Sequence, residues 1–261
     1  MKRFLSGLVM TAATLGAIWY APPAVFLLIL GLVLVAACVE LAGLMAQPKA
    51  GMPLYAPVAG ALAACAAVAR PGPQTGPVLI GTALALLVAV LATRKPAPGV
   101  PAAAAAALFP AVYLAVPLAL VAVIRDTWGR EALLLGLLVV WTSDTAQFYV
   151  GSTFGRRRLA PRISPKKSVE GAIGGFAAGV AAMAVLGRLW LPGVGLPALA
   201  AAGAALVILG IGGDLFESLL KRSADVKDSS ALIPGHGGVL DRIDALLFAV
   251  PGYYLILAAL A

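Results

Sequence analysis

The chain has 261 residues, of which 62% are hydrophobic and 11% are charged, and its mean hydropathy is +1.00. An ordinary soluble domain has about 25% charged residues, so this composition excludes that class of protein. In a soluble protein the net charge of +8 would suggest a nucleic-acid partner. In a chain as apolar as this one, the positive charge indicates how the chain is oriented across the membrane, and we expect no nucleic-acid partner.

Apolar segments of helical length follow one another along the whole chain. They lie at about residues 4–20, 24–46, 54–69, 77–93, 101–124, 131–150, 171–191, 198–220 and 243–260. A membrane-spanning helix needs roughly 20 mainly apolar residues, and the alternation typical of barrel strands is missing. The predicted fold class is therefore all-α: a polytopic integral membrane protein with about nine transmembrane helices. Prolines crowd the ends of the third and fourth segments, which leaves the count open by one.

The first apolar segment follows Lys2 and Arg3, as in a secretory signal. It ends, however, in the aromatic residues Trp19 and Tyr20 followed by prolines, and it offers no site of small residues for cleavage. We therefore predict a retained helix with an aromatic anchor at the membrane interface.

The basic residues are distributed unevenly between the two sides of the predicted bundle. With the N-terminus in the cytoplasm, only four of the 19 Lys and Arg residues lie on the opposite side: Arg70, Arg125, Arg130 and Arg188. Such a bias is typical of cytoplasmic loops. It supports nine spans and places two polar loops, 151–170 and 221–242, together on the cytoplasmic face.

Polar residues divide the chain into two parts. Residues 1–139 have one acid inside an apolar segment, Glu40, and little else that is polar there. We interpret this part as scaffold helices, with a lipid-facing wall or the interface of a homodimer as its role. Residues 140–261 carry polar groups inside helices and at their cytoplasmic ends, and we expect the catalytic site there.

The eighth apolar segment ends in a polar stripe. Its members are spaced at i, i+3, i+4 and i+7, and are Asp214, Glu217, Ser218 and Lys221. This spacing puts them on one helical face, which a membrane helix turns toward the bundle interior or a wet cavity. A polar network that only holds helices together is the alternative.

Two acids lie near the two ends of the loop 221–242, because Asp214 precedes it on the eighth segment and Asp241 lies at its end, at the start of the next helix. A hairpin of antiparallel helices would bring both carboxylates to one cytoplasmic rim. Carboxylates beside a phosphate site suit Mg²⁺, which completes its octahedron with water and phosphate oxygens. Salt bridges to Lys221 or Arg242 are the alternative role for this pair.

The loop itself mixes both signs of charge. Its charged residues outside the stripe are Arg222, Asp225, Lys227, Asp228, Asp241 and Arg242. Lys and Arg are the donors that bind phosphate oxygens, although a solvated loop end is the alternative. Residues 234–238 form a predicted tight turn, Pro-Gly-His-Gly-Gly, whose amides can surround a phosphate. A lone His236 in such a turn is more often structural than a general base.

The loop 151–170 offers a second set of polar residues. Asp144 and Gln147 lie one helical turn apart just before it. Its second half is Arg-Ile-Ser-Pro-Lys-Lys-Ser-Val-Glu-Gly, residues 162–171. Ser168 is a candidate N-cap for the seventh helix, and this role is compatible with phosphate binding, because a helix N-terminus attracts anions.

These segments together resemble the signature of the phosphatidate cytidylyltransferases. Residues 218–244 match it as Ser-x-hydrophobic-Lys-Arg, then Lys-Asp, Pro-x-His-Gly-Gly and Asp-Arg-x-Asp. The Phe-Gly-Arg at 154–156 and the Ser-Pro-Lys-Lys loop match elements upstream of it, with Ser168 where threonine is usual. The resemblance covers about residues 140–250.

The resemblance implies an enzyme that transfers the cytidylyl group of CTP to phosphatidate, giving CDP-diacylglycerol and pyrophosphate. It implies catalytic roles for Asp144, Asp214, Lys221 and Asp241, and Mg²⁺ binding by Asp214 and Asp241, with Asp244 as a further ligand. The expected substrate-binding residues are Ser164, Lys166, Lys167, Ser168, Ser218, Arg222, Lys227, Asp228, His236, Gly237, Gly238 and Arg242.

The expected location is the inner membrane of a bacterial cell, with the active site facing the cytoplasm. Whether a monovalent cation joins the metal site is left open by the sequence. A CTP-dependent lipid kinase and a transporter are the rival functions. A transporter would place its polar groups near the middle of the membrane; here they gather at one face, which favours chemistry at the interface.

Overall fold

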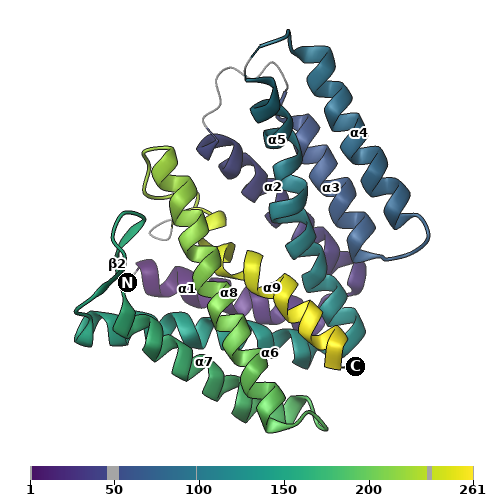
Figure 1. The fold of residues 1–261 in the computed structure, drawn as a ribbon. Coiled ribbons are helices and arrows are strands. Elements are labelled where there is room, and N and C mark those ends of the chain that lie inside the picture. The colour runs from purple at the N-terminus through teal and green to yellow at the C-terminus, as the bar shows by residue number, and fades with distance from the viewer. Residues whose placement is uncertain (1, 46–52, 98, 234–236, 261) are drawn as a thin grey trace. The chain divides into compact units, whose positions relative to one another are not determined.

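The structure, a computed structural model, describes residues 2–45, 53–97, 99–233 and 237–260. Helices dominate these residues, and the helices are α1 (Lys2–Tyr20), α2 (Pro23–Leu44), α3 (Tyr55–Ala69), α4 (Thr75–Thr93), α5 (Val100–Pro110), η1 (Ala111–Ala115), α6 (Val116–Phe154), α7 (Val169–Trp190), α8 (Leu196–Ser223) and α9 (Leu240–Leu260). Each predicted apolar segment overlaps helical residues of this set, so the predicted helices are confirmed (Figure 1).

Six helices of the described residues are long and apolar enough to cross a membrane. One of them runs from Val100 to Phe154, which is 55 residues, whereas about 20 residues suffice for one span. Gly129 interrupts it with a φ of 93°, and this break falls between the predicted spans 101–124 and 131–150. An all-α membrane protein is therefore supported, and the number nine and the orientation of the N-terminus stay predictions.

The chain forms two compact units. The first contains Met1–Val123 and Ser223–Arg242, and the second contains Ile124–Arg222 and Ile243–Ala261. The first unit therefore includes the loop between α8 and α9, although this loop lies far along the sequence. The predicted division into residues 1–139 and 140–261 follows polarity rather than compactness and stays a prediction.

The first unit is held together by small residues between helices. α3 and α4 lie side by side (Figure 1), and a Cβ on Gly60 of α3 would come within 2.8 Å of Leu86 Cδ1 on α4. Leu86 and Val90 pack with Ala103 and Ala107 of α5 in a buried cluster. α5 passes into the π-helical turn η1 directly after Pro110, where the missing proline N–H widens the turn.

Glycines allow α7 to pack closely on α6 and α8 in the second unit. Gly171, Gly175 and Gly179 recur every four residues, so they share one face of α7. A Cβ on Gly171 would come within 2.8 Å of the Gln147 carbonyl oxygen of α6. Because the backbones approach so closely, α7 fixes the part of α6 that carries Gln147.

A two-stranded antiparallel sheet lies between α6 and α7, where the sequence predicted only a polar loop. Its strands are β1 (Arg158–Ala160) and β2 (Ser164–Ser168), with Arg158 opposite Ser168. Strand β2 leads directly into α7. The hairpin therefore gives Lys166 and Lys167 a fixed backbone position in front of a helix N-terminus.

Candidate active site

Three acids from three helices form a carboxylate cluster in the second unit. Asp144 comes from α6, Asp214 from α8 and Asp244 from the first turns of α9, and each interacts electrostatically with the other two. Gly213 makes this possible, because a Cβ there would lie 3.2 Å from the Cα of Ala245. Close contact between α8 and α9 at Gly213 therefore sets Asp214 beside Asp244.

A lysine from the hairpin neutralises part of this cluster. Lys167 Nζ lies 2.7 Å from Asp214 Oδ2, and both side chains are partly exposed, at 20% and 29%. The other oxygen, Asp214 Oδ1, accepts a long hydrogen bond of 3.4 Å from Ser218 Oγ. Since both partners of Asp214 are side chains, the carboxylate can exchange them without any movement of the backbone.

Gln147 acquires a definite contact that the sequence left open. Its Nε2 donates hydrogen bonds to Asp144 Oδ1, at 3.1 Å, and to Ser143 Oγ, at 3.2 Å. The amide therefore orients the Asp144 carboxylate from one turn further along the same helix.

The polar stripe of α8 resolves into two pairs. Asp214 bonds with Ser218, and Glu217 forms an ion pair of 2.7 Å with Lys221. Glu217 is fully buried and Lys221 is 9% exposed. Lys221 was expected to bind phosphate, and the structure places it in a buried ion pair. An ammonium group has three N–H donors, so this pair does not exhaust it.

The start of α7 is tied to the end of α6. Ser168 Oγ accepts a hydrogen bond of 3.1 Å from the Gly171 N–H, which confirms the predicted N-cap. The Glu170 carboxylate accepts bonds from the backbone N–H groups of Arg156, at 2.9 Å, and Arg157, at 3.2 Å. These contacts hold the hairpin strand that carries the exposed Lys166, the partly buried Lys167 and Ser164.

The other predicted residues belong to the loop between α8 and α9, in the first unit. Asp241 Oδ2 accepts three hydrogen bonds: from Ser229 N at 2.9 Å, Ser229 Oγ at 2.7 Å and Gly238 N at 2.8 Å. Gly237 has a φ of 79°, and its carbonyl accepts a bond of 2.8 Å from Ile233 N. His236 lies outside the described residues.

The predicted site residues are thus divided between the two units. Those in the second unit are Asp144, Ser164, Lys166, Lys167, Ser168, Asp214, Ser218, Lys221, Arg222 and Asp244, and Arg222 Nε donates to the Ile163 carbonyl at 3.3 Å. Those described in the first unit are Gly237, Gly238, Asp241 and the exposed Lys227, Asp228 and Arg242. That Asp214 and Asp241 share one rim stays a prediction.

Two acids in this region were missing from the predicted site. Glu217 stands four residues before Lys221, and this spacing could have indicated their ion pair. Glu40 was noticed as a charge within an apolar segment, but nothing in the sequence identifies its partners. The structure shows that Glu40 accepts hydrogen bonds from Ser229, Ser230, Val239 and Leu240.

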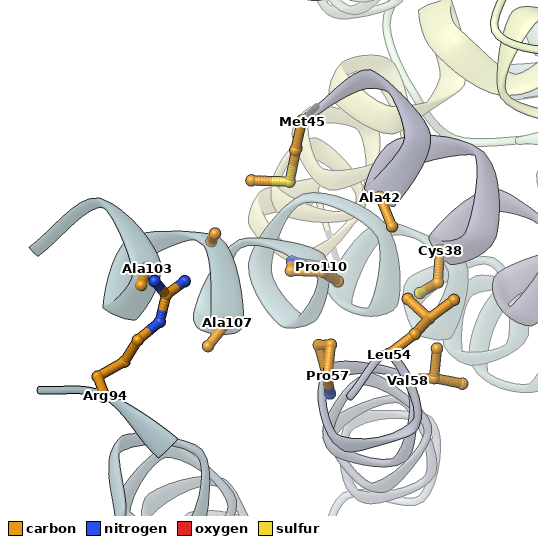
Figure 2. Close-up of a pocket in the computed structure, with 11 residues that line it drawn as sticks. Cys38, Ala42, Met45, Leu54, Pro57, Val58, Arg94, Ala103, Ala107 and Pro110 are labelled. Carbon is orange, nitrogen blue, oxygen red and sulfur yellow. The ribbon is translucent and has the colours of Figure 1, made fainter. Parts of the chain in front are cut away.

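A separate cavity of about 200 Å³ lies in the first unit, among α2, α3 and α5. Figure 2 shows its lining, in which Cys38 of α2, Met45 directly after α2, Pro57 of α3 and Pro110 of α5 surround the space. Among the described residues of the lining, the ionisable side chains are Arg94 and the Cys38 thiol. With no acid to hold a metal ion, this cavity differs in chemistry from the carboxylate cluster.

A comparison with protein families decides the family of the chain. A family model described as "Cytidylyltransferase family" matches residues 1–260, nearly the whole chain. The chain belongs to this family. Its carboxylates and lysines at helix ends are therefore those of a family named for cytidylyl transfer.

Several curated relatives carry the name phosphatidate cytidylyltransferase. The protein of Bacillus subtilis is 41% identical over 137 residues, which are 51% of this chain and 49% of the relative. The protein of Pseudomonas aeruginosa is 45% identical over 124 residues, which are 47% of this chain and 46% of the relative. The protein of Thermotoga maritima is 43% identical over 138 residues, which are 51% of this chain and 50% of the relative. The chain thus spans about half the length of the curated relatives it matches.

Proposed function

We propose that this protein transfers the cytidylyl group of CTP to phosphatidate and releases pyrophosphate. The carboxylate cluster of Asp144, Asp214 and Asp244 with Lys167 beside it carries the proposal, because carboxylates that would hold a divalent cation and a lysine that would bind phosphate oxygens together suit a nucleoside triphosphate. Membership in the Cytidylyltransferase family and the names of the relatives support it. The product would be CDP-diacylglycerol, a precursor in phospholipid synthesis.

The chemistry asks little of the protein beyond positioning. The second pKa of a phosphomonoester is about 6, so phosphatidate is largely a dianion at neutral pH. One of its oxygens attacks the α-phosphorus of CTP, a P–O bond forms, and the bond to the leaving pyrophosphate breaks. No proton has to be removed from the nucleophile. A site of acids and lysines therefore suffices, and the reaction needs no protein nucleophile activated by a general base. This argues against a lipid kinase, because its hydroxyl substrate needs a base.

The cationic side chains would hold and neutralise the phosphates. Lys167 contacts Asp214, and it would exchange that carboxylate for a phosphate oxygen when CTP binds. Lys166, Lys221 and Arg222 would contribute further charge, since they lie on the same hairpin or at the end of α8. Fixed positive groups of this kind stabilise the charge that develops on the pyrophosphate.

The donor set fits Mg²⁺. Carboxylate oxygens are the ligands of hard divalent cations, and Asp214, Asp241 and Asp244 would hold the ion. Among the described residues, no three acidic, His or Cys side chains converge so closely that they alone could hold a metal. Mg²⁺ needs only one or two protein carboxylates when phosphate oxygens and water complete the shell, so part of this set would suffice. When bound, Mg²⁺ would neutralise the phosphates of CTP.

The metal assignment can be tested separately. Asp241→Asn should abolish turnover at low Mg²⁺ while the protein still folds, because an amide binds Mg²⁺ more weakly than a carboxylate. Near-wild-type activity of this variant at low Mg²⁺ would show that the assignment is wrong. Replacing K⁺ in the same assay by a large organic cation tests whether a monovalent ion contributes.

We further propose nine spans in the bacterial inner membrane, with the N-terminus and the site facing the cytoplasm. The distribution of Lys and Arg supports this topology. Phosphatidate would enter through a lateral gap near the ends of α6, α8 and α9, because exposing its acyl chains costs about 0.8 kcal/mol per CH₂. Labelling of single cysteines in the loops by an impermeant maleimide tests the topology. The mass of the purified particle tests a homodimer.

One assay separates the three functions considered. Purified protein in lipid nanodiscs is incubated with CTP labelled in the cytidine, Mg²⁺ and phosphatidate, and the lipid fraction is analysed. Label in CDP-diacylglycerol supports the proposal. Label only in free CDP, with a phosphorylated polyprenol when that lipid is supplied, indicates a kinase. Absence of both products from folded protein would overturn the proposed function.

A further inference from the structure

Glu40 is a buried carboxylate that lies on α2 and contacts residues 189 to 200 positions later in the chain. Oε1 accepts hydrogen bonds from Ser230 Oγ, at 2.7 Å, and Val239 N, at 2.9 Å. Oε2 accepts them from Ser229 Oγ, at 3.0 Å, and Leu240 N, at 2.8 Å. The residue is only 6% exposed, so this full set of donors compensates for the burial of its charge.

Two of these donors belong to the N-terminus of α9. The first N–H groups of a helix have no acceptor within the helix, and Val239 N and Leu240 N are such groups at the start of α9. Glu40 therefore caps α9 from another helix, and its negative charge lies at the positive end of the α9 dipole. The position of the first turn of α9 depends on α2 as a result.

Glu40 is also linked to Asp241 through a shared serine. Ser229 Oγ lies 3.0 Å from Glu40 Oε2 and 2.7 Å from Asp241 Oδ2. A hydroxyl carries one hydrogen, so it donates to one carboxylate at a time, and the two acids are coupled through it. Gly238 passes this pair so closely that a Cβ would meet Ser229 Oγ and Glu40 Oε2. The turn thus fits closely around the two acids.

We propose that Glu40 is a positioning residue for Asp241: it sets Ser229, Ser230 and the first turn of α9. The proposal rests on the proposed function, in which Asp241 holds Mg²⁺ beside CTP. It places a determinant of the metal site on α2, in the part of the chain that the sequence marks as scaffold. Glu40 acts through Ser229 and the backbone and does not touch the substrates.

Glu40→Gln is the sharpest variant, since it preserves the shape of the side chain. The amide has one acceptor oxygen, and its NH₂ group donates. A serine hydroxyl can rotate and accept a hydrogen bond from that NH₂ group. A backbone N–H cannot, so whichever of the Val239 and Leu240 N–H groups faces the NH₂ group loses its acceptor. Glu131→Gln is the matched control, because Glu131 is exposed on α6.

The first experiment measures hydrogen exchange and Mg²⁺ dependence in nanodiscs. In Glu40→Gln we expect the amides of residues 238–241 to exchange at least about tenfold faster, and the Mg²⁺ concentration for half-maximal activity to rise about tenfold. The KM for CTP should change less, and Glu131→Gln should match the wild type. Unchanged exchange and unchanged Mg²⁺ dependence in Glu40→Gln would overturn the proposal.

A double-mutant cycle tests the link through the serine and remains informative if Glu40→Gln fails to fold. Ser229→Ala alone should raise the Mg²⁺ requirement more than Ser230→Ala, because Ser230 contacts Glu40 but not Asp241. Ser229→Ala combined with Glu40→Gln should raise the Mg²⁺ requirement little more than Glu40→Gln alone does. Additive effects, or equal effects of the two serine variants, would refute the coupling. If wild-type protein forms no CDP-lipid, the proposed function fails, while hydrogen exchange still tests the role of Glu40.

Discussion

Two acids of the first unit and two acids of the second unit have different kinds of hydrogen-bond donors. Glu40 and Asp241 accept hydrogen bonds from backbone N–H groups and serine hydroxyls of one loop. Asp144 and Asp214 contact only side chains, namely Gln147, Ser218 and Lys167, in the bonds that the structure shows. Backbone donors hold a carboxylate in place, whereas side-chain donors can leave it. The first arrangement fixes a carboxylate in one position, which suits support of a loop and a metal ligand that is already in place. The second suits exchange of partners with an arriving cation or phosphate.

The largest effect should follow from removing the charge at the centre of the exchangeable cluster. Asp214→Asn is expected to lower turnover at least about 100-fold, because the amide cannot bind Mg²⁺ or pair with Lys167 as the carboxylate does. The measurement is the rate of CDP-lipid formation at saturating CTP. Asp126→Asn, at an acid whose side chain is 47% exposed, is the control and should keep the wild-type rate. Comparable rates for both variants would show that Asp214 has no role in the reaction.

Two neighbouring glycines test whether close helix packing sets the cluster. Gly213→Ala is expected to destabilise the protein by about 1–3 kcal/mol and to lower turnover, since its Cβ would push Asp244 away from Asp214. Gly212→Ala is the matched control, because nothing lies within 4 Å of its Cβ. It should leave the protein unchanged or slightly more stable, as alanine favours helix. Thermal unfolding in detergent compares the two variants, and equal melting temperatures would contradict the packing argument.

Lys167 tests the exchange of partners. Lys167→Ala should raise the KM for CTP about tenfold, which corresponds to about 1.4 kcal/mol, with a smaller effect on kcat. Initial rates over a range of CTP concentrations give both constants. Lys95→Ala, at an exposed lysine of the first unit, should leave both unchanged. A loss of folded protein with an unchanged KM in the remainder would instead make the contact with Asp214 structural.

The smallest effect concerns the cap of α7. Ser168→Ala should lower stability by about 1 kcal/mol, since the Gly171 N–H loses its acceptor, and Ser168→Thr should restore most of it. Chemical denaturation measures the difference. The exposed Ser152 provides the control in Ser152→Ala. A raised KM for CTP in Ser168→Ala with unchanged stability would point to phosphate binding rather than capping.

Much of the local structure could be predicted because its causes are local. Apolar length predicts each helix, and the prolines at 22 and 23 separate α1 from α2. Ser168 was predicted as an N-cap, and Gly237 as part of a tight turn, because hydroxyls cap and glycines turn wherever they occur. The hairpin before α7 was missed, since its strands are short and contain charges and a proline rather than an alternating apolar pattern.

The partners of the charged residues were harder to predict. The sequence places Lys221 among phosphate ligands, and the structure pairs it with Glu217 in a buried contact. Lys167 could have faced any acid of the cytoplasmic side, and the hairpin brings it to Asp214. Charges act over several ångströms in any direction, so spacing along one helix constrains their partners only weakly.

The sequence by itself determined the class of the protein: an apolar helical chain whose polar signature near the C-terminus marks a cytidylyltransferase. Composition and motif suffice for this, because each is a property of neighbouring residues. Only the tertiary structure decided that Glu40 of α2 accepts four hydrogen bonds from the loop before α9, and that Gly213 brings Asp214 beside Asp244. Such contacts join residues far apart in the chain. They depend on how helix faces meet, which no local pattern specifies.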